Sequence, residues 1–202
     1  MSNPIKYYFA CMSPWSYLGF DRLVEIAGRY GRDITLMPTD VGRSWSETGA
    51  GQPLGERPKV LQSYRLIELR RWAAWRGIPI NAEPKHFPVP NLLSSHVIIA
   101  AGQAGIDTIG VTRALMRGCW VDELNIGDPE DVMVILDGLG LDGAALVKSS
   151  RSDTVAAELQ SNTDLTLADK AWSVPSIVVD GELFFGQDRL EMIDWRLSST
   201  GS

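Results

Sequence analysis

The sequence predicts an α/β protein in which a strand–helix–strand unit and a strand–strand–helix unit are separated by a long helical segment. Two observations lead to this prediction. Short apolar runs typical of strands occur near the two ends of the chain. Between about residues 58 and 168, apolar residues recur at helical spacing instead, and no convincing strand is present.

The first unit begins with an apolar strand over residues 7–10, followed by a tight turn. Ser13 is a good helix N-cap because its hydroxyl can accept from a free backbone N–H one turn on. Pro14 suits the first helical position, where its missing N–H is not needed. The helix is predicted to end near Gly31, and a second strand follows over residues 33–37. Such a unit places its two strands in parallel.

The middle of the chain is predicted to be helical after one long loop. Residues 42–58 are rich in Gly, Ser and Pro, which predicts a lid or binding loop, or else a plain surface excursion. Residues 83–91 are proline-stiffened and extended. The predicted helices cover residues 59–76, 92–105, 108–120, a stretch from Pro129 capped by Asp128, a stretch from about 142, and 153–168.

The end of the chain returns to a strand pattern. Residues 176–179 form a β-branched strand, residues 180–181 a hairpin turn, and residues 182–185 the returning strand. Residues 186–190 open a last helix. The complete order predicts a thioredoxin-like fold with a large all-helical insertion: residues 1–45 and 169–202 form the thioredoxin-like domain, and residues 46–168 the insertion domain.

The composition excludes several classes of function. The net charge of -6, without a basic run, argues against a nucleic-acid partner. No stretch is long and apolar enough to span a bilayer, and the N-terminus does not resemble a secretory signal. Cys11 and Cys119 show no metal-ligand spacing, and with only 2 histidines no metal site is expected. We therefore expect a cytoplasmic protein without a membrane partner.

Ser13 is the first candidate for a functional residue. A helix that begins directly after a strand offers an anion site, because its dipole and its free N–H groups point toward the turn. Ser13 stands where a thiolate could be held. The alternative is that Ser13 serves only as a helix cap.

Four blocks of sequence resemble the family that joins 2-hydroxychromene-2-carboxylate isomerases, kappa-class glutathione transferases and disulfide-bond oxidoreductase A. They follow in the family's order and span nearly the whole chain. The blocks are residues 9–17 (Phe-Ala-Cys-Met-Ser-Pro-Trp-Ser-Tyr), residues 71–79 followed by 87–91, residues 120–129, and residues 173–176 with 185–189.

The resemblance implies glutathione as the cofactor. Oxidoreductases of the family carry two cysteines where this chain has Ser13 and Ser16, so thiol–disulfide exchange is not expected. A serine can still donate a hydrogen bond to the sulfur of bound glutathione and favour its thiolate. Val174 and Pro175 resemble the family's cis-proline turn, whose free backbone groups pair with the cysteinyl part of glutathione. Three further residues are expected at the γ-glutamyl end: Gln187, Asp188 and Arg189.

The activity implied is that of the isomerases, which interconvert 2-hydroxychromene-2-carboxylate and trans-o-hydroxybenzylidenepyruvate in aromatic-hydrocarbon catabolism. The small aromatic carboxylate substrate needs apolar walls, for which the candidates are Trp15, Trp45 and Trp172. Lys59 is the candidate for its carboxylate. Gln52 is a possible stand-in for the family's loop Asn.

Further departures from the family fall near the substrate side. Ala10 stands where many relatives carry an acid, and Leu61 replaces a basic residue before the helix tyrosine. Cys11 replaces an aromatic and is expected to be a buried thiol. A homodimer is usual in such families and is expected here.

Two other functions stay open at this point. A kappa-type transferase would use the same Ser13 site but release a glutathione conjugate. A non-catalytic thioredoxin-fold binding module would use Ser13 only as a cap and would not bind glutathione.

Overall fold

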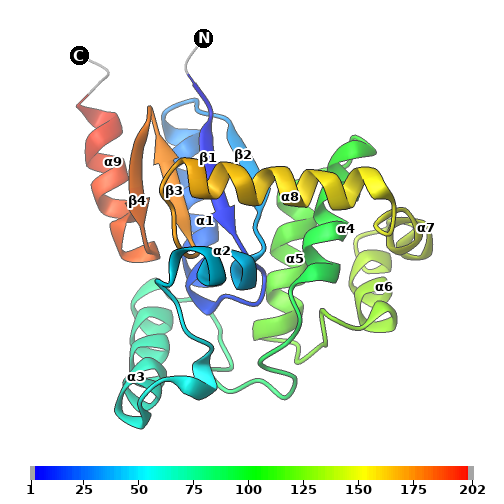
Figure 1. Ribbon diagram of the computed structural model, residues 1–202, viewed down its shortest axis with the longest axis horizontal. Helices are drawn as coiled ribbons and strands as arrows, with labels where there is room; N and C mark the ends of the chain where they lie inside the picture. Colours follow the sequence, from blue (N-terminus) through cyan, green and yellow to red (C-terminus); the bar gives the residue numbers. More distant parts are fainter. Residues whose placement is uncertain (1–2, 200–202) are drawn as a thin grey trace.

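The computed structural model describes residues 3–199 and places a four-stranded mixed sheet among helices (Figure 1). The sheet has the spatial order β2-β1-β3-β4, with β1 parallel to β2 and antiparallel to β3, and β3 antiparallel to β4. The predicted α/β architecture and both end units are confirmed. The strands are β1 (Ile5–Phe9), β2 (Ile34–Pro38), β3 (Ser176–Val179) and β4 (Glu182–Phe185).

The helices follow the predicted order, and within residues 58–168 the structure describes no strand. Asp128 caps its helix by accepting hydrogen bonds from two backbone N–H groups, at 2.9 and 3.3 Å. The helices are α1 (Pro14–Arg29), α2 (Val41–Thr48), α3 (Lys59–Arg76), α4 (Leu92–Gln103), α5 (Thr108–Trp120), α6 (Pro129–Asp137), α7 (Gly143–Ser149), α8 (Asp153–Ala168) and α9 (Leu190–Ser198), with short 3-10 turns η1 (Leu54–Glu56) and η2 (Gln187–Arg189).

The alternation of side chains along β1 explains how the sheet is covered. Tyr7 and Phe9 point into the main apolar cluster, together with residues of α1 and α9. Tyr8 points the other way and packs with Val178 and Met37. Figure 1 shows α8 crossing this second face of the sheet, opposite α1. A strand covered on both faces needs apolar residues at most positions, and in β1 the exception is the partly buried Lys6, whose ammonium group pairs with Asp169 at 2.7 Å.

The prediction of one long loop over residues 42–58 is wrong for its first half, which forms α2. Asp40 caps this helix by accepting from the Arg43 N–H at 3.0 Å, and Gly49 ends it in the left-handed conformation. The buried residues of α2 are Val41 and Ser44. The high content of Gly and Ser hid the helix, because the capping and packing that stabilise it are not visible as an apolar period. The predicted domain boundary at residues 45/46 falls inside α2.

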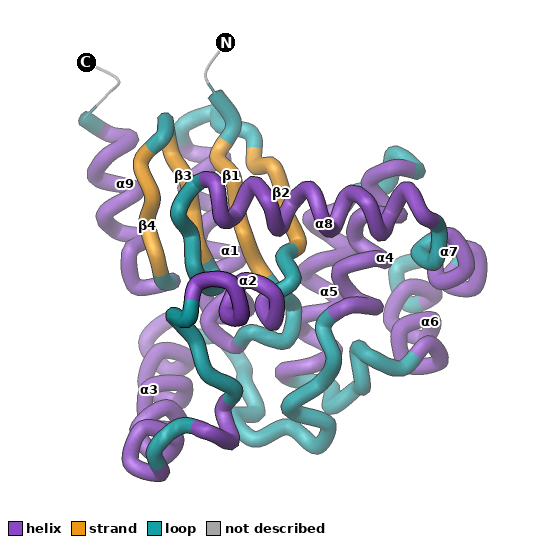
Figure 2. Tube along the Cα trace, in the orientation of Figure 1, coloured by secondary structure: helices purple, strands orange, loops and turns teal. Residues whose placement is uncertain are grey.

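The apolar residues of α3 lie differently from those of the other helices. Val60, Tyr64 and Ile67 share one face but are 72%, 53% and 49% exposed. The buried residues of α3 are Leu69 and Ala73. The last helix, predicted to open over residues 186–190, begins at Leu190 as α9, and the 3-10 turn η2 precedes it. Figure 2 shows α3 at the end of the molecule remote from the chain termini, joined to the rest by loops.

The main apolar cluster extends from the sheet and α1 into α4–α7, so the two predicted domains share a core. Trp120 of α5 is fully buried in this cluster, and its indole N–H donates to the Cys11 carbonyl at 3.0 Å. The helices of residues 3–199 include none with the length and apolar character needed to cross a membrane.

Candidate active site

Ser13 lies in the tight turn between β1 and α1. Its backbone N–H donates to the Ala10 carbonyl at 2.9 Å, which closes the turn. Its Oγ accepts from the Ser16 N–H at 3.2 Å, so Ser13 is the N-cap predicted from the sequence. The Ser13 hydroxyl proton makes no hydrogen bond with any described residue and is available to a ligand. The residue is 8% exposed, and it faces a cavity.

The loop before β3 faces Ser13 across that cavity. The Val174–Pro175 peptide bond is cis, as the resemblance implies, and Phe87–Pro88 is a second cis bond that was not expected. Among the described residues, the Val174 N–H and C=O have no hydrogen-bond partner. Pro175, by contrast, accepts from the Gly186 N–H at 2.9 Å, which fixes the loop to the end of β4.

The cavity beside Ser13 measures about 330 Å³ and its walls are mostly apolar. Trp45 of α2 forms one wall, and its indole N–H donates to the Ser173 hydroxyl at 3.0 Å. This hydrogen bond ties the Trp45 ring to the loop that contains the cis proline. A cavity of this size with apolar walls suits a small aromatic ligand. The other wall residues include Met12, Pro14, Trp15, Val41, Leu54 and Phe87.

A second cavity of about 280 Å³ shares Trp15, Val174 and Phe185 with the first, so the two adjoin along the cis-proline loop. Pro175, Gln187 and Asp188 line it on one side, and Glu68 and Trp72 of α3 on the other. It has two carboxylates, on Asp188 and Glu68, which form ion pairs with Arg189 and Arg71 respectively.

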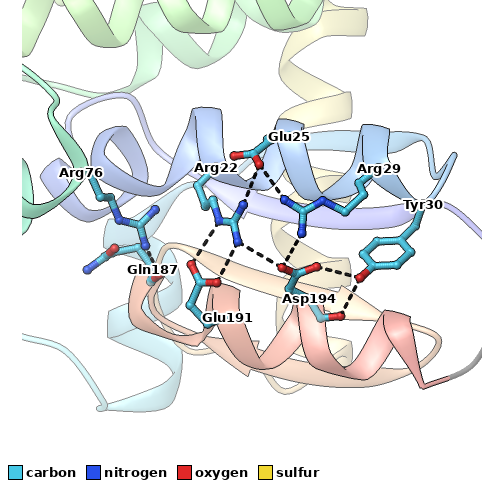
Figure 3. A network of polar contacts seen from close by, with 8 residues as sticks. All are labelled: Arg22, Glu25, Arg29, Tyr30, Arg76, Gln187, Glu191 and Asp194. Atoms are coloured by element: carbon cyan, nitrogen blue, oxygen red, sulfur yellow. Dashed lines mark hydrogen bonds and ion pairs between the residues drawn. The ribbon is translucent and has the colours of Figure 1, made fainter.

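The turn η2 carries Gln187 and Asp188 of this second cavity, and a hydrogen bond from α3 holds it in place (Figure 3). The Arg76 guanidinium donates to the Gln187 carbonyl oxygen at 3.1 Å and lies over the Trp72 ring at 5.3 Å. Gln187 is 3% exposed, and its side-chain Oε1 has no partner among the described residues.

The start of α9 is held in the same region by α1. Arg22 of α1 donates two hydrogen bonds to Glu191, at 3.1 and 2.7 Å, and Asp194 accepts from Arg29 at 2.7 Å (Figure 3). Paired, bidentate contacts of this kind fix orientation well. The helix that follows η2 is therefore fastened to the helix that begins at Ser13.

The first cavity is positively charged. Arg57 and Arg65 line it, and its described lining residues include no Asp or Glu. Desolvation by burial and, to a smaller extent, the nearby charge of Arg57 together lower the pKa of Arg65 to about 10. The guanidinium of Arg65 therefore stays charged at neutral pH in a partly dry site.

The two cysteines line neither of the two cavities. Cys11 and Cys119 are both free and buried, as expected for Cys11. Burial raises the pKa of the Cys119 thiol to about 12, and raises that of the Cys11 thiol as well, so both remain protonated. Within residues 3–199 no three His, Cys, Asp or Glu side chains gather as a metal site.

The structure brings most of the residues singled out in the sequence to the two cavities. Ser13, Trp15, Trp45 and Val174 line the first cavity. Trp15 and Val174 also line the second, together with the three residues Pro175, Gln187 and Asp188.

Four candidates do not line either cavity. Lys59 and Gln52 are exposed. Trp172 packs against the Phe185 ring at 4.6 Å, and Arg189 lies on the surface in a 3.6 Å ion pair with Asp188.

Sequence reasoning missed the two cavity arginines and Glu68. Arg65 and Glu68 stand on α3 between exposed apolar residues, so their spacing is that of an ordinary solvated helix face. Arg57 lies in a stretch predicted to be loop.

Comparison with known proteins places this geometry among relatives. The family model described as a DSBA-like thioredoxin domain matches residues 4–198. A 2-hydroxychromene-2-carboxylate isomerase of Sphingobium xenophagum is 27% identical over 96% of this chain and 97% of its own. A protein of Caenorhabditis elegans named glutathione s-transferase kappa 2 is 26% identical over 94% of this chain and 89% of its own. A solved structure of 2-hydroxychromene-2-carboxylate isomerase superposes with a TM-score of 0.83 at 24% identity, over 97% of this chain and 95% of that one.

Proposed function

Because the chain belongs to the DSBA-like thioredoxin domain family and carries Ser13 where a redox enzyme needs cysteine, we propose that it is a glutathione-dependent isomerase. The proposed reaction interconverts 2-hydroxychromene-2-carboxylate and trans-o-hydroxybenzylidenepyruvate. The observation that carries the proposal is the position of Ser13, at a helix N-terminus in an apolar cavity, opposite the unpaired backbone of Val174. The relatives named as such isomerases support the choice of reaction.

The residues present fit glutathione. The free N–H and C=O of Val174 can pair with a peptide backbone, as a strand edge does. The buried, unpartnered Oε1 of Gln187 can accept a hydrogen bond from an ammonium group. The carboxylate of Asp188, in the same cavity, can pair with that ammonium group. Both polar groups lie on η2, so the tie between Arg76 and the Gln187 carbonyl positions them together.

Bound glutathione would supply a thiol nucleophile that adds reversibly to the conjugated carbon of the substrate, which turns a double bond into a single bond; rotation about that bond would precede elimination of the thiolate. Ser13 has the task of holding that sulfur as a thiolate. Its hydroxyl can donate one hydrogen bond, and the free N–H groups at the start of α1 add the favourable end of the helix dipole. The apolar walls exclude water from the thiolate and strengthen both interactions.

Turnover with a small amount of glutathione tests the proposal. The substrate is supplied in large excess over glutathione, its ultraviolet spectrum is followed, and free thiol is measured before and after. We expect complete isomerisation with full recovery of the thiol, and none without glutathione.

Two other outcomes would contradict the proposal and favour the alternatives. Loss of thiol in proportion to the product would indicate a kappa-type transferase, for which the relative named glutathione s-transferase kappa 2 provides support. Absence of glutathione binding would leave a non-catalytic binding module with Ser13 as a cap.

A further inference from the structure

Two guanidinium groups without a counter-charge line the cavity that holds Ser13. Arg57 precedes α3, and Arg65 lies in its second turn. The described lining residues of this cavity include no carboxylate. The carboxylate whose charge acts on Arg65 is Glu83, which is engaged by Arg70 in a 3.0 Å ion pair outside the cavity. Two like charges that face one apolar space repel each other, and a bound anion would offset that repulsion.

Arg65 is the group with unused hydrogen-bonding capacity. Its Nη2 is buried and has no hydrogen-bond partner among the described residues. Its guanidinium carbon lies 4.9 Å from the centre of the Phe87 ring, a cation–π contact that holds the group beside the ring. A buried donor without a partner is costly, and a ligand that accepts from it removes the cost.

Arg57 is held in place by the loop that precedes it. Its Nε donates to the Gln52 carbonyl oxygen at 2.9 Å, and its guanidinium carbon lies 5.7 Å from the Trp45 ring centre. These contacts use one donor and one face, which leaves the terminal nitrogens for a ligand. Each arginine therefore stands against an aromatic wall residue, Arg57 against Trp45 and Arg65 against Phe87.

We propose that Arg65 and Arg57 form an anion subsite that binds the carboxylate of a flat aromatic acid whose ring lies between Trp45 and Phe87. Arginine suits this task because its planar fork matches a carboxylate in two hydrogen bonds. The subsite selects acids over neutral electrophiles at the Ser13 site. It takes the place of Lys59, whose side chain is exposed and does not line the cavity.

The inference rests on the proposed function only for the reaction that follows binding. Recognition of the acid depends on the two arginines and the apolar walls, and it needs no glutathione. Binding of an unreactive acid can therefore be measured on the protein alone.

The test is a calorimetric titration, without glutathione, with trans-2-hydroxycinnamate and with its neutral amide. We expect the wild type to bind the acid about tenfold or more tightly than the amide, because the amide cannot form a charged pair. Arg65→Met should remove this preference by weakening the acid alone. Arg65→Lys keeps the charge without the fork and should retain part of the preference.

The matched control is Arg70→Met, which removes an exposed arginine of the same helix outside the cavity. It should leave both affinities unchanged. Thermal unfolding of each variant establishes that it is folded.

Three results would overturn the inference: equal binding of acid and amide by the wild type, an unchanged preference in folded Arg65→Met, or a loss in that variant of glutathione affinity with acid binding intact. The last result would assign the arginines to a carboxylate of glutathione. Selective acid binding in a protein that fails to turn over would retain this subsite and refute the isomerase. Turnover that is unchanged in Arg65→Met would retain the isomerase and refute this subsite.

Discussion

Ser13→Ala separates the two possible roles of this serine, as a helix cap and as a donor to a thiolate. The Ser13 Oγ accepts one backbone hydrogen bond, from the Ser16 N–H at 3.2 Å. Loss of such a cap costs about 1 kcal/mol of stability, which lowers the Tm of a chain of this length by about 2–4 °C. The same substitution removes one hydrogen bond to a charged sulfur.

The second effect is the larger one and is seen in a different quantity. A hydrogen bond to a charged group is worth about 1.5–3 kcal/mol, and one pKa unit corresponds to about 1.4 kcal/mol. The pKa of the bound glutathione thiol should therefore rise by about 1 to 2 units in Ser13→Ala. The helix dipole contributes about 0.3–1 kcal/mol and is unchanged by the substitution.

The assay is a pH titration of thiolate absorbance in the glutathione complex, paired with thermal unfolding. Ser152→Ala is the matched control, because Ser152 caps α8, which has the same length of 16 residues as α1, by accepting from the Val155 N–H at 3.4 Å. Both variants should lose similar stability, and only Ser13→Ala should shift the thiol pKa. An unchanged thiol pKa in a destabilised Ser13→Ala would show that the serine is only a cap.

Three further predictions follow from individual contacts. Arg76→Ala removes the donor to the η2 carbonyl and should raise the Kd for glutathione about threefold to tenfold, by calorimetry, without affecting acid binding. Gly51→Ala places a Cβ about 2.2 Å from the Trp45 ring, so the ring must move, and acid affinity should fall while indole fluorescence changes. The Arg32 guanidinium lowers the pKa of Asp180, so stability that is present above about pH 4 should be lost as the pH falls through the lowered folded-state pKa.

Each of these predictions has a control and a result that contradicts it. Arg70→Ala, on the same helix as Arg76, should leave glutathione affinity unchanged. Gly28→Ala meets nothing within 4 Å and should leave fluorescence unchanged. Arg32→Met should flatten the acid limb of the stability curve, measured by urea unfolding, by about 1 kcal/mol or less. Equal effects of Arg76→Ala and Arg70→Ala, an unmoved Trp45 ring, or an unaltered acid limb would each refute the contact in question.

Much of the fold follows from local patterns in the sequence. The cap at Ser13, the helix over residues 59–76 and the hairpin around Asp180 depend on residues close in the chain, and all three are present. The helix α2 was missed because its stability comes from the Asp40 cap and from burial of Val41, against partners distant in sequence. Local propensity alone cannot reveal such burial.

The candidate site divides in the same way. Ser13 and Val174 stand beside a strand end and a proline, which give them a recognisable setting in the sequence. Arg65 lies within a helix of ordinary composition, and the packing of α3 on α1 together with the contact of Arg65 with Phe87 places it at the cavity. Lys59, six residues earlier, has the same charge but lies outside the cavity. Both residues belong to α3, and tertiary contacts decide which positions of that helix reach the cavity.

The most direct test of the account is the titration of glutathione into the wild-type protein by calorimetry, repeated in buffers of different ionisation enthalpy. If the Ser13 site holds glutathione as a thiolate, binding should saturate at one site per chain and release protons, so the measured heat should change with the buffer. Saturable binding without proton release would contradict the role given to Ser13. Absence of binding would contradict the glutathione-dependent function proposed for this protein.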